Sequence, residues 1–271
     1  MEQDLEILSK SIQFGEAFLK ELEKKTDLKL EDKIIIALYR KLLEQADSCY
    51  VLADHNLDGP LTVMKRTIFE TYLSLRYILQ EEKSITLRAH SYYVGFLKDA
   101  KIDGEDWISQ RKVDISDLNI EHDINGITEI LNSPLLKNTI KEWEDTKTNF
   151  ERKFKRKYNP KWYSLYNGPT SIKALSNKLM QNEVLVYKMY GSFSQEAHGY
   201  KALDASNKME LIDKPLVLKP IRSHIDPSNI GVCRSLLTGA MFEVVCYLLP
   251  DRLEDCVEFA DTIGMKAEIN K

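Results

Sequence analysis

Residues 31–56 read EDKIIIALYRKLLEQADSCYVLADHN, and residues 61–82 read LTVMKRTIFETYLSLRYILQEE. Apolar residues recur in both stretches every three to four positions, which is the spacing of a helix with one buried face. The intervening Asp58, Gly59 and Pro60 are typical of a tight connection. The two stretches therefore predict two long helices joined by a short turn, and they indicate an all-α protein.

The remaining sequence shows similar helical spacing. Further helices are predicted at about 3–25, 84–101, 122–132, 135–157, 182–200, 228–249 and 251–265, and a short one ends near residue 180. Residues 102–119 are predicted to be a loop, and residues 214–227, with three prolines, an extended segment. We therefore expect an all-α fold, with a single helical-bundle domain of about eight to ten helices over residues 31–271.

Residues 1–30 are expected to form an amphipathic helix that precedes this core domain. Its apolar positions include Leu5, Leu8 and Ile12, and Gly15 lies within the same stripe. The glycine either weakens the helix or lets a neighbouring helix approach closely. Because the chain offers no obvious partner of similar length, we expect this helix to be a dimerisation element of a homodimer.

The composition is that of a soluble globular protein, with 43% hydrophobic and 30% charged residues. The net charge of -4 argues against general binding of polyanions, so contact with nucleic acid would need a local basic patch. No stretch has the features of a signal peptide or the apolar length of a membrane span. The four cysteines have no metal-binding spacing and are expected to be reduced. We therefore expect a cytoplasmic protein without membrane contact.

Residues 190–200, YGSFSQEAHGY, contain no lysine or arginine although they belong to a predicted helix. One side of that helix carries the apolar residues Leu185, Met189 and Phe193. The opposite side carries Tyr187, Tyr190, Ser194 and His198. Because a solvent-facing side usually holds charged residues, this uncharged polar side indicates a second packed or ligand-lining surface.

The helix predicted over residues 61–82 offers a partner for that polar side. Arg66 and Glu70 are four residues apart, so they can form an ion pair along the helix. Because the helix is otherwise strongly apolar, we expect this pair to have low exposure. Because buried polar groups must satisfy one another, we expect Tyr190, Ser194 and His198 to face this pair. Further candidates for contact with a ligand are Tyr77, Arg88, Tyr92, Tyr187 and Tyr190.

The residue types suit the cleavage of a phosphodiester without a metal. The sequence has no metal-ligand motif, phosphate-binding glycine loop or esterase elbow, so no metal and no cofactor are expected. In this hypothesis His198 is the general acid or base and Arg66 stabilises charge on the phosphate. Glu70 orients the histidine, while Ser194 and Tyr190 position the substrate. The alternative is a purely structural polar seam, since buried ion pairs and histidines near helix ends often stabilise a fold.

A basic run lies in KTNFERKFKRKYNPKW, residues 147–162. Its cations include Lys153, Arg156 and Lys157, and aromatic residues interleave them. Such a pattern is typical of a surface that binds RNA. A solvated helix end would carry the same charges, so both interpretations stay open.

These motifs resemble a bacterial family of uncharacterised all-helical proteins that combine an R-x-x-x-E helix with a later Y-x-x-x-S-x-x-x-H helix. The matching stretches are RTIFE, residues 66–70, and YGSFSQEAH, residues 190–198. The loop and helix WYSLYNGPTSIKALSNKL, residues 162–179, also resemble this family. The resemblance spans roughly residues 35–250 and implies a helical fold without a settled activity.

A more distant resemblance is to the HEPN helical domains, many of which are RNases of toxin and antiphage systems. Those nucleases use an R-x-x-x-x-H motif on one helix, which this chain lacks, because Arg66 and His198 belong to different helices. Arg88 and His90 have the wrong spacing. An active site would therefore have to be assembled between helices.

The function that we expect is that of a HEPN-like bacterial effector, in antiphage defence or a toxin system, which binds RNA and cleaves it without a metal. One alternative is a non-enzymatic helical module that recruits a protein partner. Another is a pocket for a small metabolite or nucleotide, lined by Arg66, Tyr92, Tyr190 and His198. The exposure of the polar residues discriminates these possibilities. Residues that meet at an accessible site favour an active site, and residues that are sealed from solvent favour a structural role.

Overall fold

The computed structural model describes residues 2–110, 119–180, 190–195, 197–198, 220–222 and 225–264. These residues form helices, turns and loops and no strand, so the predicted all-α fold is confirmed. The chain divides into two compact units, unit 1 (Met1–Leu79 with Leu179–Lys271) and unit 2 (Gln80–Lys178). This division differs from the expected arrangement of an N-terminal helix followed by one core domain.

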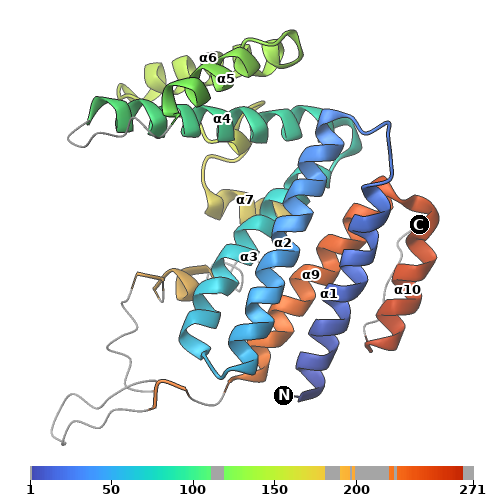
Figure 1. Cartoon of the computed structure of the whole chain (residues 1–271). Helices are drawn as coiled ribbons and strands as arrows, with labels where there is room; N and C mark the ends of the chain where they lie inside the picture. Colours follow the sequence, from blue (N-terminus) through green and yellow to red (C-terminus); the bar gives the residue numbers. More distant parts are fainter. Residues whose placement is uncertain are drawn as a thin grey trace, which may run out of the picture. The chain divides into compact units, whose positions relative to one another are not determined.

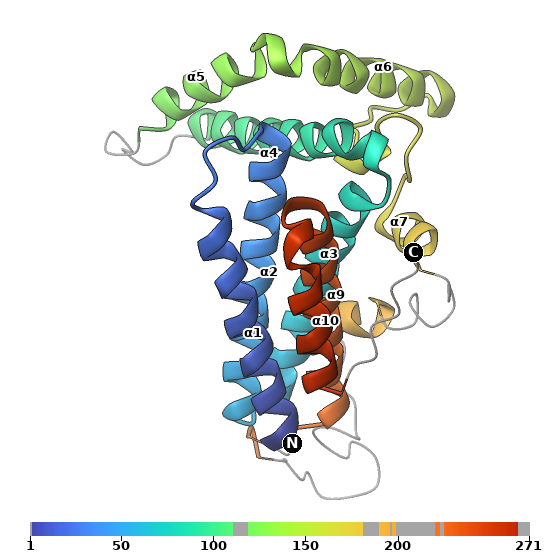
Figure 2. The same cartoon turned by 90° about the vertical axis from the view of Figure 1, so that its right-hand side faces the viewer.

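Unit 1 is a bundle of long helices that bury a common apolar core. Its labelled elements are α1 (Glu2–Leu22), α2 (Leu30–Asp54), α3 (Asp58–Leu79), α9 (Pro227–Leu248), the short η5 (Pro250–Arg252) and α10 (Leu253–Thr262). Figures 1 and 2 show α1, α2, α3 and α9 running side by side, and α10 packs against α9. Among the fully buried side chains are Leu8, Leu42, Leu73 and Val244, one from each of the four long helices. Burial of such side chains is the main favourable contribution to the stability of the bundle.

The N-terminal helix α1 has its partners within the chain, because it packs against both α2 and α9. A Cβ atom on Gly15 would lie 2.6 Å from the hydroxyl of Tyr39 and 2.7 Å from Cδ2 of Leu43. Of the two interpretations of this glycine, the structure therefore favours close approach of a neighbouring helix. The packing of α1 removes the argument from which we expected a homodimer, and the oligomeric state stays a prediction.

Helix α9 is the most apolar long helix of the unit. The Asp226 side chain caps it by accepting a hydrogen bond from the Ser228 N–H at 2.9 Å, and Pro227 follows as a favoured first residue. Among the described residues, α9 is the one helix with the length and composition of a candidate membrane span. Half of that stretch is buried within the protein, and a core helix of a soluble protein passes the same test.

Unit 2 is built on the long helix α4. Its elements are η1 (Glu82–Ser84), α4 (Ile85–Ser109), α5 (Ile120–Leu131), η2 (Pro134–Leu136), α6 (Lys137–Phe154), η3 (Trp162–Ser164) and α7 (Ile172–Leu179), whose last residue belongs to unit 1. Both α5 and α6 pack against α4, as Figures 1 and 2 show. The short 3₁₀ helix η3 also contacts α4, where a Cβ atom on Gly95 would lie 2.9 Å from Cβ of Trp162.

The predicted loop over residues 102–119 is wrong for its first half, because α4 continues to Ser109. A Cβ atom on Gly104 would lie 3.0 Å from Cγ1 of Ile124, so α5 covers this part of α4 closely. Such tertiary packing outweighs the weak local preference for a helix. Most of the predicted helix over 182–200 and of the extended segment over 214–227 lies outside the described residues.

Candidate functional site

Helix α3 presents an ion pair on its partly exposed side. Nε of Arg66 donates to Oε1 of Glu70 at 2.9 Å, as the spacing of four residues predicts. The two side chains are 23% and 36% exposed. The pair is therefore only half-buried, whereas the sequence predicted a pair with low exposure.

Apolar contacts place the segment 190–198 against α3. Its residues 190–195 are helical, and Phe193 is buried with its ring 6.5 Å from that of Phe69 in an edge-to-face arrangement. The ring of Tyr190 lies 6.4 Å from the same Phe69 ring. Nζ of Lys65 lies 5.0 Å from the centre of the Phe193 ring, in cation–π contact. These contacts fix the side of the segment that faces Arg66.

Lys65 is a buried cation that the sequence interpretation missed. Its Nζ donates a short hydrogen bond to Oδ1 of Asn229, and Nδ2 of Asn229 donates to Oδ1 of Asp58 at 2.7 Å. The chain of hydrogen bonds joins α3 to the first turn of α9. A signal was available in the sequence, because Lys65 lies at helical spacing between the apolar residues Leu61 and Ile68. A lysine within an apolar stripe indicates a buried polar partner.

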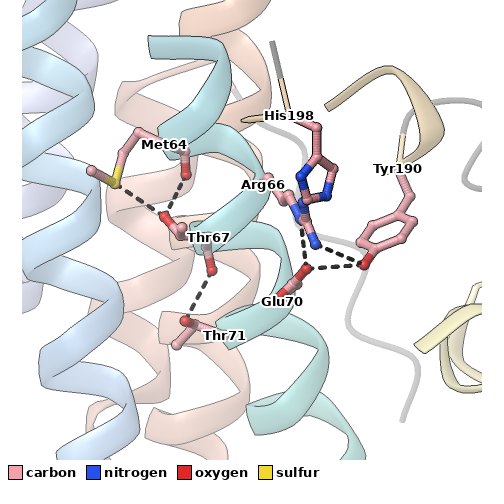
Figure 3. A network of polar contacts seen from close by, with 7 residues as sticks. All are labelled: Met64, Arg66, Thr67, Glu70, Thr71, Tyr190 and His198. Carbon is pink, nitrogen blue, oxygen red and sulfur yellow. Dashed lines mark hydrogen bonds and ion pairs between the residues drawn. The ribbon is translucent and has the colours of Figure 1, made fainter. Parts of the chain in front are cut away.

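The side chains of Arg66, Glu70, Tyr190 and His198 converge in one network (Figure 3). The Tyr190 hydroxyl donates to Oε1 of Glu70 at 3.1 Å. Nη2 of Arg66 contacts the Tyr190 hydroxyl at 3.4 Å, and Nη1 of Arg66 contacts Nε2 of His198 at 3.5 Å. This cluster links α3 to a segment of the chain that lies about 130 residues later in the sequence.

Charge and burial set the protonation of two members of this network. The hydrogen bond to Glu70 raises the pKa of Arg66, so the guanidinium stays charged. Burial, and then the negative charge of Glu70, raise the pKa of Tyr190, so its hydroxyl remains a donor. For Nε2 of His198 to accept from the guanidinium of Arg66, the imidazole must be neutral with its proton on Nδ1.

The contacts of the Arg66 guanidinium differ in strength. Its Nε has a short, charge-assisted bond to Glu70, while its two terminal nitrogens have contacts of 3.4 and 3.5 Å, near the outer limit of hydrogen bonding. Glu70 therefore fixes the orientation of the guanidinium and occupies neither of its terminal nitrogens. Those nitrogens can turn to an anionic ligand that enters beside His198. The expectation that Glu70 orients His198 is wrong for this geometry, because its carboxylate bonds Arg66 and Tyr190 instead.

Three further candidates from the sequence lie apart from the network or outside the described residues. The Ser194 carbonyl accepts the His198 N–H at 3.1 Å, but the Ser194 hydroxyl is not part of the network. Tyr77 is a buried residue of the same helix as Arg66, roughly 16 Å along its axis. Tyr187 lies outside the described residues.

The remaining candidates belong to unit 2. Arg88 pairs with Glu81, whose Oε2 lies 3.1 Å from Nη2 of the arginine. The ring of Tyr92 packs edge-on against Trp162 at 5.1 Å, and burial raises the pKa of its hydroxyl. The candidates Lys153, Arg156 and Lys157 are exposed at the end of α6. In the part of the chain that the structure describes, no group of three or more His, Cys, Asp or Glu residues is arranged to hold a metal ion.

The family model of DUF5677, a family of unknown function, matches residues 32–213. The chain belongs to the DUF5677 family. The DUF5677 match includes α3 and the segment 190–198, and therefore both sides of the Arg66 network. The match begins close to residue 35, where the resemblance was expected to start, and it ends well before residue 250, where the resemblance was expected to end. Helices α1, α9 and α10 lie outside the match. No curated protein and no solved structure matches this DUF5677 chain.

Proposed function

We propose that this DUF5677 protein is a ribonuclease that needs no metal ion and whose active site is the network of Arg66, Glu70, Tyr190 and His198. The observation that carries the proposal is the 3.5 Å contact between Nη1 of Arg66 and Nε2 of His198. It brings a phosphate-binding cation and a proton-accepting nitrogen within reach of one phosphodiester. The proposal agrees with the toxin or antiphage role that the resemblance to HEPN domains implies.

In this proposal Arg66 binds the substrate phosphate. A guanidinium can donate two parallel hydrogen bonds to two oxygens of one phosphate. The bond from Nε to Glu70 holds the plane of the guanidinium in place, which lowers the cost of ordering it when substrate binds. The Tyr190 hydroxyl, kept protonated by its raised pKa, donates to Glu70 in the absence of substrate and would turn this single proton to the phosphate when substrate binds.

Proton transfer falls to His198. Its neutral Nε2 takes the proton of the ribose 2′-hydroxyl, and the 2′ oxygen then attacks the adjacent phosphorus. The bond from phosphorus to the 5′ oxygen breaks, and the leaving oxygen takes a proton from water while His198 returns its proton to solvent. The products are a 2′,3′-cyclic phosphate and a 5′-hydroxyl end. Arg66 stabilises the charge that develops on the phosphate oxygens.

The exposure of the network favours a polymer over a small metabolite as the substrate. His198 is exposed, and the side chain of Glu70 is 36% exposed. Sites for small molecules are usually concave and enclose most of the ligand. A half-exposed cluster on the side of a helix instead admits one phosphodiester of a long chain.

The test is incubation of the purified chain with end-labelled single-stranded RNA in excess chelator. We expect cleavage that leaves a 2′,3′-cyclic phosphate, and no cleavage of DNA or of 2′-O-methyl RNA of the same sequence. His198→Ala should abolish the activity and leave the thermal unfolding of unit 1 nearly unchanged. His122→Ala is the matched control, because His122 is an exposed histidine of unit 2 whose side chain is 80% exposed.

Two outcomes would overturn the proposal. One is the absence of cleavage over a pool of RNAs of mixed sequence. The other is cleavage that is undiminished in the folded His198→Ala protein, because the activity would then come from another site or from a contaminant.

A further inference from the structure

The end of α6 in unit 2 carries a concentrated positive charge that the proposed active site does not use. Residues 152–157 are all exposed. Residues 151–161 contain the cations Arg152, Lys153, Lys155, Arg156, Lys157 and Lys161 and a single acidic residue, Glu151. The whole chain has a net charge of -4, so this surface is positive on a protein that is negative overall.

Aromatic rings lie within the same surface. The rings of Phe150 and Tyr158 stack with their centres 4.4 Å apart and their planes 11° apart. The ring of Phe154 lies 5.6 Å from that of Phe150. Phe154 is 50% exposed, so the stacked pair supports a ring that is open to solvent. An exposed ring that is supported from behind and surrounded by cations offers a face on which a base can stack.

Two of the cations lie over the exposed ring. Nζ of Lys153 is 5.4 Å, and Cζ of Arg156 6.0 Å, from the centre of the Phe154 ring, in cation–π contact. Both side chains are exposed, so one of them can swing aside when a base stacks on Phe154, and its charge then lies near the phosphates next to that base. This combination of an aromatic platform and flanking cations is how proteins bind single strands without reading their sequence.

The backbone supplies an independent observation at Lys155. This residue ends α6 in the left-handed conformation, with φ 52° and ψ 36°, where glycine is the usual residue because it lacks a Cβ atom. The turn brings Tyr158 back onto Phe150, and Oε1 of Glu151 accepts the Tyr158 N–H at 3.1 Å. A lysine at a position that favours glycine adds charge to this surface at the expense of backbone strain.

We propose that the surface formed by Lys153, Phe154, Lys155 and Arg156 binds single-stranded nucleic acid. Charge alone would favour a duplex, which has the higher density of phosphates. An exposed ring adds affinity only for bases that are free to stack, so it favours a single strand. The inference does not depend on the proposed cleavage, because it concerns binding by unit 2 and uses none of the residues of the Arg66 network.

The experiment measures fluorescence anisotropy of labelled oligonucleotides with the full chain carrying His198→Ala, so that cleavage does not interfere. The probes are a single strand of about 12 nucleotides, as RNA and as DNA, and the duplex of the same sequence. At about 50 mM salt we expect the single strands to bind several-fold more tightly than the duplex, with affinity falling steeply by about 200 mM salt.

Two variants separate the ring from the charge. Phe154→Ala should weaken binding of the single strand by about tenfold and affect the duplex little. Lys155→Gly should weaken binding of both, while its thermal unfolding temperature stays the same or rises, because glycine relieves the backbone. A loss of binding in this second variant cannot be attributed to unfolding.

Matched controls exist in the same unit. Leu135→Ala removes an apolar side chain that is 61% exposed, and Lys137→Ala removes an exposed charge at the opposite end of α6. Neither control should change the affinity for the single strand. Equal binding of duplex and single strand with no effect of Phe154→Ala would overturn the inference. So would binding only to vesicles with anionic headgroups, or equal losses in the variants and the controls.

Discussion

Nε of Arg66 lies 2.9 Å from Oε1 of Glu70, and both side chains keep contact with solvent at 23% and 36% exposure. An exposed ion pair contributes little to folding, so Glu70→Gln should lower the free energy of unfolding by no more than about 1 kcal/mol. The loss of several kcal/mol that a buried pair would give is not expected from this geometry. Cleavage of RNA should instead fall by roughly 100-fold, because the guanidinium loses its fixed orientation.

Urea unfolding and the cleavage assay measure the two quantities on the same preparation. Glu44→Gln is the control, since Glu44 pairs with Arg40 at 3.0 Å on the exposed side of α2 and has no part in the network. It should show the same small change in stability with full cleavage activity. Full activity of Glu70→Gln would show that Arg66 needs no such support.

Tyr190→Phe tests the hydroxyl apart from the ring. The ring contact with Phe69 at 6.4 Å should remain, so the change in stability should stay below about 1 kcal/mol, while cleavage falls by about tenfold. Because burial raises the pKa of Tyr190, the hydroxyl should stay protonated up to at least about pH 10. The rate profiles of wild type and Tyr190→Phe should therefore be parallel from about pH 8 to 10. A wild-type rate that drops in this range, against a flat profile for the variant, would contradict this assignment.

The sequence predicts most of the helices and the meeting of Arg66 with His198 because both depend on local spacing. Apolar positions every three to four residues define the buried faces of α2 and α3. The side of the later segment that carries Tyr190 and His198 has no charged residue, and the charges of Arg66 and Glu70 on α3 have opposite signs. Two such polar sides can satisfy one another. The pairing of Arg66 with Glu70 follows from their separation by four residues.

The division into two units and the degree of exposure depend on contacts that spacing does not contain. The apolar stripe around Lys65 indicates that this cation is buried, but the spacing does not name its partner Asn229, which lies 164 residues later in the sequence. The helical state of residues 102–109 depends on α5, which covers Gly104 with Ile124. The half-exposure of Glu70 was likewise not predictable, because it is set by how the later segment packs on α3.

Gly15 and Gly231 are both helical glycines, and their replacement by alanine should have opposite effects. The Cβ atom of Gly15→Ala would lie 2.6 Å from the hydroxyl of Tyr39, which is fully buried and cannot move away freely. Overpacking should outweigh the better helix propensity of alanine, with a net loss of about 1–2 kcal/mol. Apart from the neighbouring backbone of its own helix, no heavy atom of the described residues lies within 4 Å of a Cβ on Gly231, so Gly231→Ala should gain up to about 1 kcal/mol. Thermal unfolding of the two variants measures the difference, and a stabilised Gly15→Ala would contradict the close packing of α1 on α2.

Glu243 on α9 is a carboxyl group in a largely buried setting. Its Oε1 lies 3.5 Å from Nε of Arg76, and Nη1 of Arg76 donates to the Tyr72 hydroxyl at 2.7 Å. Burial raises the pKa of Glu243 from its ordinary value of 4.5 to about 6, although the charge of Arg76 opposes the shift. The pKa of Tyr72 is raised mainly by burial and next by Glu243, so its hydroxyl stays neutral. Desolvation therefore outweighs the ion pair at this position.

The raised pKa of Glu243 predicts how stability depends on pH. The folded state holds this proton more tightly than the unfolded state, so the contribution of Glu243 to stability is fully present below about pH 4.5 and is lost as the pH rises through about 6. The loss should approach about 2 kcal/mol at neutral pH. Glu243→Gln has no such proton to lose, so its free energy of unfolding relative to wild type should rise by up to that amount between about pH 4.5 and 8.

Urea unfolding across this range measures the difference, and Glu258→Gln, at an exposed position of α10, should give a constant difference instead. A constant difference for Glu243→Gln as well would mean that Arg76 compensates fully for the burial of the carboxylate.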